Sequence, residues 1–234
     1  MTSHSSGITV VIFARGEEAT IGRIINEIKN CFTRGKVVAV ITNKSIKTLE
    51  ILKNYKISPI FDNGKGKGAA IRMAIELISS DILVFMDADG SHRPKEIPLL
   101  VEPILKNESD LVIASRLRGK SEELGNNLEN IIRLLGNLLS SFLIKILWGK
   151  RGQFILDCQN GFRAIKADVA RKLCLTSNTF AIEQEMVIRC LKKGYRIREI
   201  PSYEIKRKFG KSHINPFSML FQYMYCFFNE IVRR

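Results

Sequence analysis

Residues 82–90 read Ile-Leu-Val-Phe-Met-Asp-Ala-Asp-Gly and carry the sharpest signal in the chain. Its first five residues are apolar and predict a short buried strand over residues 82–86. The strand leads directly into two acidic residues, Asp87 and Asp89. In open α/β sheets, ligands gather at the carboxyl ends of the strands. The sequence therefore places two carboxylates where an α/β protein binds its ligand.

Strands and helices alternate along the chain around this segment. Apolar runs predict further strands at 8–13, 37–41, 57–61, 111–114 and 196–200. Helical periodicity predicts helices at 18–32, 46–52, 69–78, 97–105, 130–148, 180–191 and 216–232. This alternation is typical of an α/β fold with a mostly parallel sheet flanked by helices. Residues 117–127 are polar and contain glycine, so we predict a loop there. With no repeat and no Pro- or Ser-rich linker, residues 1–234 are expected to form one domain.

Composition narrows the partners and the compartment. The formal net charge is +14, from 37 Lys and Arg against 23 Asp and Glu. Such an excess favours nucleic acid, anionic membrane or phosphorylated substrates as partners. The five scattered cysteines lack a C-x-x-C pair, which argues against a disulfide framework or zinc site and indicates a reducing compartment. We see no signal peptide and no run of about 20 apolar residues, so no transmembrane helix is predicted.

The acidic pair has the spacing of a metal site. Carboxylates at positions i and i+2 after a buried strand can direct their oxygens at one hard cation. Mg²⁺ or Mn²⁺ held there would bind a diphosphate and stabilise the charge of a leaving group. The structural alternative is a turn before Gly90 in which Asp87 and Asp89 only cap neighbouring groups.

A glycine–lysine loop at residues 64–68 is a second candidate site. It precedes a predicted helix, so its backbone N–H groups and the charges of Lys65 and Lys67 would face an anion. The alternative is a basic turn that is only solvated.

An ordered set of motifs resembles the inverting GT-A glycosyltransferases, most closely the dolichol- and polyprenyl-phosphate mannosyl- and glucosyltransferases. In chain order, the motifs are 10–12 with 14–18, 64–69, 87–89 with His92 and Pro94, 115–116, Asp157 with 161–163, Glu183 and Glu185, 194–196, and Arg207 with 210–212. The resemblance covers about residues 8–214. It implies a Rossmann-related fold in which about residues 8–115 bind a nucleotide sugar and about 116–214 bind the acceptor. The remaining residues, 215–234, form an aromatic amphipathic helix.

The resemblance also implies roles for individual residues. The residues it assigns to the metal are Asp87, Asp89 and Ser91. The residues it places at the donor nucleotide sugar are Ala14, Arg15, Glu17, Thr42, Asn43, Lys67, Asp87 and Ala88. The residues it assigns to catalysis are Asp89, Arg116, Arg133, Arg207 and Lys211, with the arginines holding donor and acceptor phosphates. By the same resemblance, Lys211 is expected to belong with Arg207 and Ser212 to a loop that closes over the acceptor phosphate.

Two departures from the family pattern affect the donor side. The family usually has Pro and Asn where this chain has Phe13 and Gly16. It also has an Asp pair where residues 42–45 read Thr-Asn-Lys-Ser. Thr and Asn can hydrogen-bond but bring no negative charge, so we expect altered base recognition. A non-catalytic relative of the fold is one alternative.

The implied reaction is transfer of a hexose from a GDP- or UDP-sugar to polyprenyl or dolichyl phosphate, with inversion. A phosphate monoester has its second pKa near about 6 and needs no strong base. The main alternative is a soluble transferase acting on a hydroxyl acceptor, which would need a base. The candidate bases are Asp157, Glu183 and Glu185, each of which could instead pair with Arg163 or Arg189.

Two helices suggest where the protein acts. Residues 130–148 and 216–232 are amphipathic or aromatic, with basic residues nearby. They predict peripheral association with the cytoplasmic face of a membrane, although both could instead pack on the sheet as core. Nucleic acid is not expected as a partner, because the basic residues are dispersed and no recognition motif is present. The oligomeric state, the sugar and the base stay open.

Overall fold

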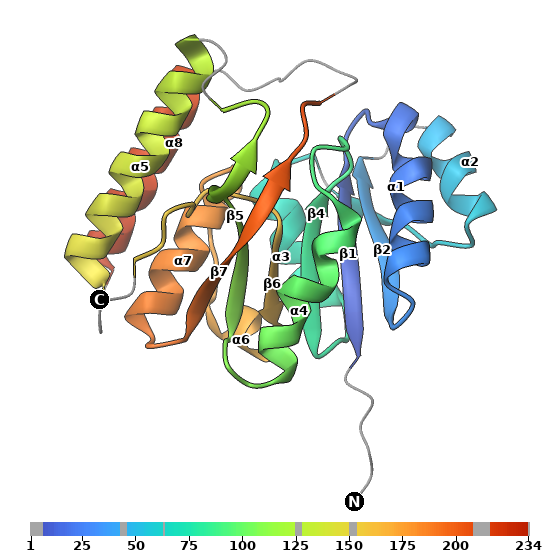
Figure 1. Cartoon of the computed structure of the whole chain (residues 1–234), viewed down its shortest axis with the longest axis horizontal. Helices are drawn as coiled ribbons and strands as arrows, with labels where there is room; N and C mark the ends of the chain where they lie inside the picture. The colour runs from blue at the N-terminus through green and yellow to red at the C-terminus, as the bar shows by residue number, and fades with distance from the viewer. Residues whose placement is uncertain are drawn as a thin grey trace, which may run out of the picture.

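The computed structural model describes residues 7–42, 46–62, 64–124, 128–149, 154–207 and 216–233. A seven-stranded sheet runs through its centre (Figure 1). The strands are β1 (Ile8–Ala14), β2 (Gly35–Thr42), β3 (Ile60–Asp62), β4 (Ile82–Asp87), β5 (Leu111–Ser121), β6 (Arg163–Lys166) and β7 (Ile197–Glu204). Their order is β3-β2-β1-β4-β6-β5-β7. Within this sheet β6 alone runs antiparallel to its neighbours, so the predicted mostly parallel α/β fold is confirmed.

Helices cover both faces of the sheet. They are α1 (Glu18–Cys31), α2 (Ile46–Asn54), α3 (Lys67–Leu77), α4 (Ile97–Leu105), α5 (Leu128–Trp148), α6 (Ala167–Lys172), α7 (Ile182–Lys192) and α8 (Pro216–Val232), with a 3-10 turn at Pro94–Glu96. Alternate residues of β1 point to opposite faces. Val10 and Ile12 pack with α1, α2 and α4, whereas Val11 and Phe13 pack with α3, α6 and α7. Burial on both faces explains why the strands read as continuous apolar runs.

The predicted loop over residues 117–127 is wrong in its first part, because β5 continues to Ser121. The extension pairs with β7, with Lys120 opposite Tyr203, after a register shift. Gly119 permits this pairing: a Cβ there would lie 2.0 Å from the carbonyl oxygen of Ser202. The segment is polar, so its composition predicts a loop, although its backbone pairs with β7 as a strand.

The segment β6–α6 was not predicted. The strand has four residues, too few for a periodic pattern, and it fits between β4 and β5 in the antiparallel sense. The third strand also differs from its prediction, since it covers Ile60–Asp62 and not residues 57–61.

Helices α5 and α8 lie side by side at one flank of the sheet (Figure 1). Their inner sides are tied to the domain. On α8, the carboxylate of Glu230 accepts a hydrogen bond from the buried Arg189 of α7 at 2.9 Å. On α5, Asn137 donates to Asp157 at 2.8 Å, and Ser141 donates to the carbonyl of Leu156 at 2.9 Å. The alternative that both helices are core therefore holds for their inner sides only.

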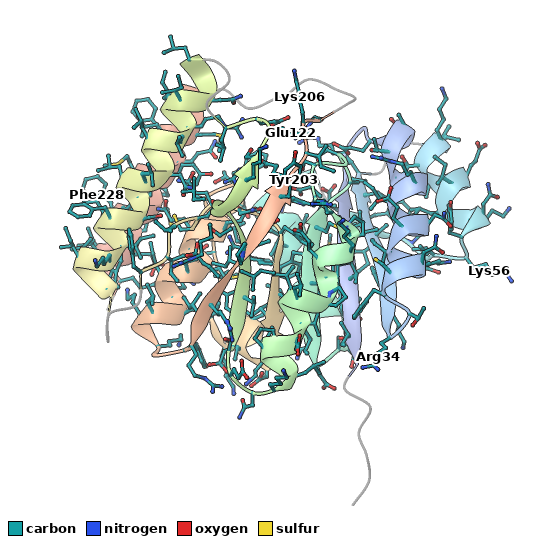
Figure 2. All side chains as sticks on the ribbon, in the orientation of Figure 1. Arg34, Lys56, Glu122, Tyr203, Lys206 and Phe228 are labelled. Atoms are coloured by element: carbon teal, nitrogen blue, oxygen red, sulfur yellow. The ribbon has the colours of Figure 1, made fainter. Side chains whose placement is uncertain are left out.

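The outer sides of the same helices are apolar and exposed. Most of the exposed large hydrophobic side chains of the described structure belong to α5 and α8, including Leu135, Phe142, Phe221 and Phe228. Phe228 points away from the body of the protein (Figure 2). By length and composition alone, Asn130–Trp148 could also cross a membrane, whereas no transmembrane helix is predicted from the sequence. Within that helix only 22% of the apolar window is buried.

Candidate active site

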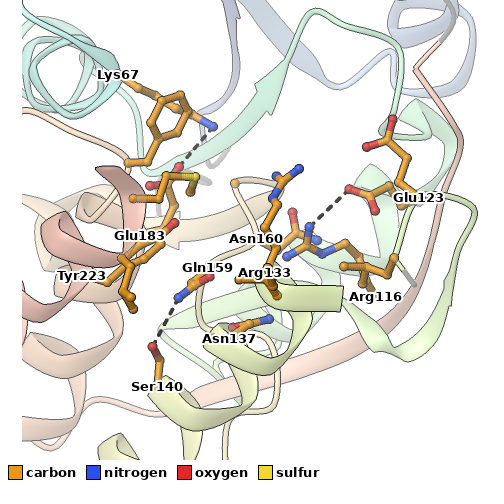
Figure 3. Close-up of a pocket in the computed structure, with 18 of the residues that line it drawn as sticks. Lys67, Arg116, Glu123, Arg133, Asn137, Ser140, Gln159, Asn160, Glu183 and Tyr223 are labelled. Carbon is orange, nitrogen blue, oxygen red and sulfur yellow. Dashed lines mark hydrogen bonds and ion pairs between the residues drawn. The ribbon is translucent and has the colours of Figure 1, made fainter. Parts of the chain in front are cut away.

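A cavity of about 320 Å³ opens at the carboxyl edge of the sheet and runs between α5 and α8 (Figure 3). Seven of the predicted site residues line it together: Lys67, Asp87, Asp89, Ser91, Arg116, Arg133 and Arg207. They come from elements far apart in the chain. The fold thus assembles the acidic pair and the predicted phosphate-binding arginines around one space.

Lys67 joins two carboxylates at the inner wall of the cavity. Its Nζ lies 2.8 Å from Asp87 Oδ2 and 3.1 Å from Glu183 Oε1. Burial lowers the pKa of Lys67, but the two carboxylates outweigh it, so the net shift is upward. A Cβ on Gly161 would lie 2.7 Å from the same Nζ, so a larger residue there would displace the ammonium group from this position. The alternative of a solvated basic turn fits the exposed Lys65 but not Lys67.

Asp89 is buried and firmly oriented. Ser91 donates both its backbone N–H, at 2.9 Å, and its hydroxyl, at 2.7 Å, to Oδ1 of Asp89. Arg207 donates to Oδ2 at 2.5 Å. Burial raises the pKa of Asp89, but His92, Arg207 and the Ser91 hydrogen bonds outweigh it and lower the pKa overall. Asp89 is therefore an ionised carboxylate, and Ser91 holds it in place.

His92 packs and orients the acidic turn. Its ring is buried and stacks on Phe162, with centroids 5.0 Å apart. Its Nδ1 accepts the backbone N–H of Asp87 at 3.3 Å. These contacts fix the end of β4, where the acidic pair begins.

Arg116 lines the cavity but is already paired with carboxylates. Asp157 accepts hydrogen bonds from its backbone N–H at 2.9 Å and from Nε and Nη2 at 2.8 Å each. Glu204 lies 3.4 Å from Nη1. The pairing is not the one with Arg163 considered from sequence. With Asn137 as a further donor, Asp157 is a fully engaged, buried carboxylate.

Glu185 does pair with Arg189, as the structural alternative predicted, at 2.5 Å. Its two oxygens also accept the backbone N–H groups of Thr176 and Ser177, both at 2.9 Å. It does not line the cavity, whereas Glu183, two residues earlier on α7, does.

Arg133 projects into the cavity from α5 (Figure 3). Arg207 enters from the end of β7, where its backbone N–H donates to Glu123 at 2.9 Å. The two predicted phosphate-binding arginines thus face the space beside Asp89. Lys211 and Ser212, predicted to act with them, lie outside the described residues.

Of the predicted donor-side residues, Lys67 and Asp87 line the cavity, whereas Ala14 and Thr42 lie outside its lining, at neighbouring strand ends. Ala14 ends β1, Thr42 ends β2, and both strands are parallel neighbours of one another. The hydroxyl of Thr42 is buried without a hydrogen-bond partner within the described ranges. Asn43 falls outside those ranges.

Glu17 folds back onto its own turn. Its carboxylate accepts the backbone N–H of the exposed Arg15. Burial raises the pKa of Glu17, and the charges of Asp89 and Asp87 add to the rise. Glu17 therefore lies within electrostatic reach of the acidic pair.

Ala88, between the two aspartates, is fully buried. Its backbone N–H donates to the carbonyl of Phe13 at 3.0 Å, and its carbonyl accepts the hydroxyl of Thr20. These bonds attach the acidic turn to β1 and α1.

Several lining residues were not singled out from sequence: Asn137, Ser140, Gln159, Asn160 and Tyr223. A signal existed for α5, since Arg133, Asn137 and Ser140 follow one another at helical spacing on its polar side. Gln159 and Tyr223 carried no such signal, because only the tertiary fold brings their loop and α8 to the cavity.

The acidic pair fits a divalent cation of the Mg²⁺ type. Mg²⁺ is commonly bound by one or two carboxylates and completes its shell with water and substrate phosphates. Two carboxylates, Asp87 and Asp89, face the cavity. No cluster of three His, Cys, Asp or Glu suited to a metal occurs among the residues that the structure describes. The two carboxylates thus suit a metal ion that is also bound by a substrate diphosphate, rather than one bound by protein ligands alone.

Comparison with known proteins identifies a matching family and several relatives. Residues 9–174 match the model of glycosyl transferase family 2. An uncharacterised protein of Methanocaldococcus jannaschii is 30% identical over 229 residues, which cover 92% of this chain and 90% of that protein. A UDP-N-acetylglucosamine–dolichyl-phosphate N-acetylglucosaminyltransferase of Methanococcus voltae is 26% identical, covering 83% and 84%. An undecaprenyl-phosphate mannosyltransferase of Micrococcus luteus is 31% identical over 140 residues, covering 58% and 54%.

The fold is also that of a solved enzyme. Glucosyl-3-phosphoglycerate synthase from Mycobacterium tuberculosis, in complex with Mn²⁺, UDP and phosphoglyceric acid, superposes with a TM-score of 0.75. The two sequences are 19% identical, and the match covers 97% of this chain and 79% of that one. Because the family model matches well over half of the chain, and a relative at 30% identity covers nearly all of it, the protein belongs to glycosyl transferase family 2 and is a glycosyltransferase with the GT-A fold.

Proposed function

We propose that the enzyme transfers a hexose from a nucleotide sugar to a polyprenyl phosphate, with inversion and with the help of Mg²⁺ or Mn²⁺. The observation that carries the proposal is the mixed lining of the cavity. Its polar lining includes Asp87, Asp89, Arg133 and Arg207. Helices α5 and α8 also contribute apolar side chains to it: Ile132, Leu139, Leu143, Met219, Leu220, Met224 and Phe227. One space thus offers a phosphate site joined to an apolar groove.

The comparisons support this choice of acceptor and donor. Two relatives are named as transferases to undecaprenyl or dolichyl phosphate, and one of them uses UDP-N-acetylglucosamine. A structural neighbour was solved with Mn²⁺ and UDP. A lipid phosphate also agrees with the net charge of +14.

The side chains have distinct tasks in the proposed reaction. A phosphate oxygen of the acceptor bonds to the anomeric carbon, and the bond from that carbon to the nucleoside diphosphate breaks. The electron pair leaves with the diphosphate, whose charge a cation on Asp87 and Asp89 would stabilise. Arg133 and Arg207 hold the acceptor phosphate, because a guanidinium matches phosphate oxygens with two parallel hydrogen bonds. The phosphate dianion attacks without a protein base.

A transfer assay tests the acceptor. The enzyme would be incubated with radiolabelled UDP-glucose, UDP-N-acetylglucosamine or GDP-mannose, Mn²⁺, and either polyprenyl phosphate or 3-phosphoglycerate. We expect label in the organic phase with at least one donor. Label confined to the phosphoglycerate product would instead identify a soluble transferase acting on a hydroxyl.

The Arg133→Ala variant makes the same assay specific to the proposed phosphate site. A hydrogen bond to a charged group contributes roughly 1.5–3 kcal/mol, so we expect lipid transfer to fall by about ten- to a hundredfold. Nucleotide-sugar binding should stay near wild type. Lys145→Ala is the matched control, because Lys145 lies on the same helix but does not line the cavity. Equal turnover by Arg133→Ala and Lys145→Ala would remove Arg133 from the site.

The same two helices carry a proposed membrane contact. The exposed apolar sides of α5 and α8 would lie in the interface of the cytoplasmic leaflet, where basic residues meet anionic headgroups. The inner polar contacts of α5, from Asn137 to Asp157 and from Ser141 to Leu156, tie that helix to the domain. We therefore favour an interfacial helix over a spanning one.

Liposome flotation measures this contact. We expect the protein to float with anionic liposomes at low salt and less so as salt rises, because screening weakens the charge attraction. Phe228→Glu places a charge on the exposed side of α8 and should reduce flotation. Leu99→Glu, on α4 at a side chain that is similarly exposed, should not. If the two variants float alike, the membrane lies against another surface.

A further inference from the structure

Glu183 holds a carboxylate oxygen that the protein itself does not satisfy. The side chain lies at the start of α7, is only 3% exposed, and lines the cavity. Oε1 pairs with Lys67, whereas Oε2 is buried without a hydrogen-bond partner in the described part of the chain. A buried charged oxygen without a partner is costly. Its cost is recovered when a hydrogen-bond donor enters from the cavity.

The surroundings of Glu183 indicate which donor. The Lys67 ammonium group contacts the carboxylates of both Glu183 and Asp87. Glu183 therefore lies next to the proposed diphosphate site. The centroid of the Phe180 ring lies 5.7 Å from Lys67 Nζ, and Tyr223 lies beside Glu183 in the cavity (Figure 3). Aromatic side chains with a few well-placed polar groups are typical of a site that orients a small ligand. The part of a nucleotide sugar next to the diphosphate is the hexose, and its ring hydroxyls are hydrogen-bond donors.

We propose that Glu183 Oε2 accepts a hydrogen bond from a ring hydroxyl of the transferred hexose and thereby selects the sugar. This inference rests on the proposed function, because it takes the donor to be a nucleotide sugar. Glu183 is preferred to Glu185 because the Glu185 oxygens are already used by Arg189 and by the backbone of Thr176 and Ser177.

Binding of the donor, rather than turnover, is the first measurement. Titration calorimetry with Mn²⁺ would compare UDP with UDP-glucose and UDP-N-acetylglucosamine, and GDP with GDP-mannose. We expect the Glu183→Gln variant to bind the preferred nucleotide sugar about ten- to a hundredfold more weakly than wild type does. The affinity of this variant for the nucleoside diphosphate alone should equal that of wild type. Glu185→Gln is the matched control and should keep both affinities while lowering the melting temperature.

Deoxy donors identify the hydroxyl. A site built to bind a hydroxyl discriminates strongly against the analogue that lacks it. The wild type should therefore lose affinity for one of the 2-, 3-, 4- or 6-deoxy forms of its preferred donor, and Glu183→Gln should be insensitive to that same deletion. Glu183→Asp keeps the negative charge but shortens the side chain, which withdraws the oxygens from the cavity. If the position of Oε2 matters, this variant should lose donor affinity as Glu183→Gln does.

The outcomes separate this inference from the proposed function. If wild type binds none of the nucleotide sugars, both are overturned. If it binds one and Glu183→Gln binds it equally well, the sugar contact alone is overturned. A third outcome is that Glu183→Gln keeps its donor affinity but loses turnover, while wild type transfers sugar to 3-phosphoglycerate. Glu183 would then be the base for a hydroxyl acceptor, and the proposed sugar contact would be overturned as well.

Discussion

Replacing Asp89 with Ala is expected to reduce sugar transfer by about a hundred- to a thousandfold, the scale seen when one group that stabilises developing charge is removed. The structure explains why. Asp89 is held by two hydrogen bonds from Ser91, and its lowered pKa keeps it charged beside the cavity. Its loss would leave Asp87 as the remaining carboxylate of the pair, and Asp87 is shared with Lys67.

Two measurements separate a lost metal site from a lost fold. The variant should keep the melting temperature of wild type within a few degrees but no longer bind Mn²⁺ together with nucleoside diphosphate, as followed by electron paramagnetic resonance. Ser91→Ala removes one of the hydrogen bonds that orient Asp89 and should have a smaller effect, about tenfold. Undiminished transfer in EDTA would contradict the assignment.

Local sequence was enough to predict the acidic pair at a strand end, because the strand and the turn that carry it are contiguous in the chain. A buried strand, two aspartates at i and i+2, and a glycine with φ of 83° follow one another within nine residues. The carboxyl end of β4 lies beside that of β1, where the strand order changes direction, and ligands bind at such points in open sheets. The sequence motif and its place in the sheet therefore indicate the same ligand site.

The two lysines of the glycine loop could not be separated in the same way. Lys65 and Lys67 look alike in sequence, with glycines on both sides of each. Only Lys67 reaches Asp87 and Glu183, and Glu183 is more than a hundred residues away in the chain. The glycines have a packing role that was also hidden: a Cβ on Gly66 would lie 2.3 Å from the carbonyl oxygen of Asn178.

Arg116 shows a second limit. From the resemblance it was expected to hold phosphates, and it does line the cavity. However, its guanidinium is bound by Asp157 and approached by Glu204, which come from a distant loop and from β7. Which arginine is paired and which is available depends on these long-range neighbours, and a single sequence does not display them.

Replacing Asp157 with Ala is therefore expected to act on stability before it acts on chemistry. Asp157 is fully buried and accepts four hydrogen bonds, three from Arg116 and one from Asn137. Removing one partner of a buried ion pair leaves the other charge uncompensated and costs about 3–5 kcal/mol. For a chain of this size, that corresponds to a fall in melting temperature of roughly 6–20 °C.

The pH dependence gives this prediction a second readout. Burial raises the pKa of Asp157, but the charge and hydrogen bonds of Arg116 outweigh it, so the pKa in the folded protein lies below the ordinary value of 3.8. A carboxylate with a lowered pKa stabilises the fold fully above its unfolded pKa, and the contribution is lost as the pH falls further. The gap in unfolding free energy between wild type and Asp157→Ala should therefore be constant near neutrality and shrink below about pH 3.8.

Asp168→Ala is the control, because Asp168 is exposed and pairs with Lys172 one helical turn away. It should change stability by less than about 0.5 kcal/mol. Asp157 also anchors Asn137, so its loss frees α5 from the loop beneath it and displaces Arg133, one turn earlier on that helix. Transfer should then fall together with stability and recover in part at low temperature. If Asp157→Ala melts like wild type yet transfers no sugar, Asp157 acts on the substrate directly, and its pairing with Arg116 gives way when the donor binds.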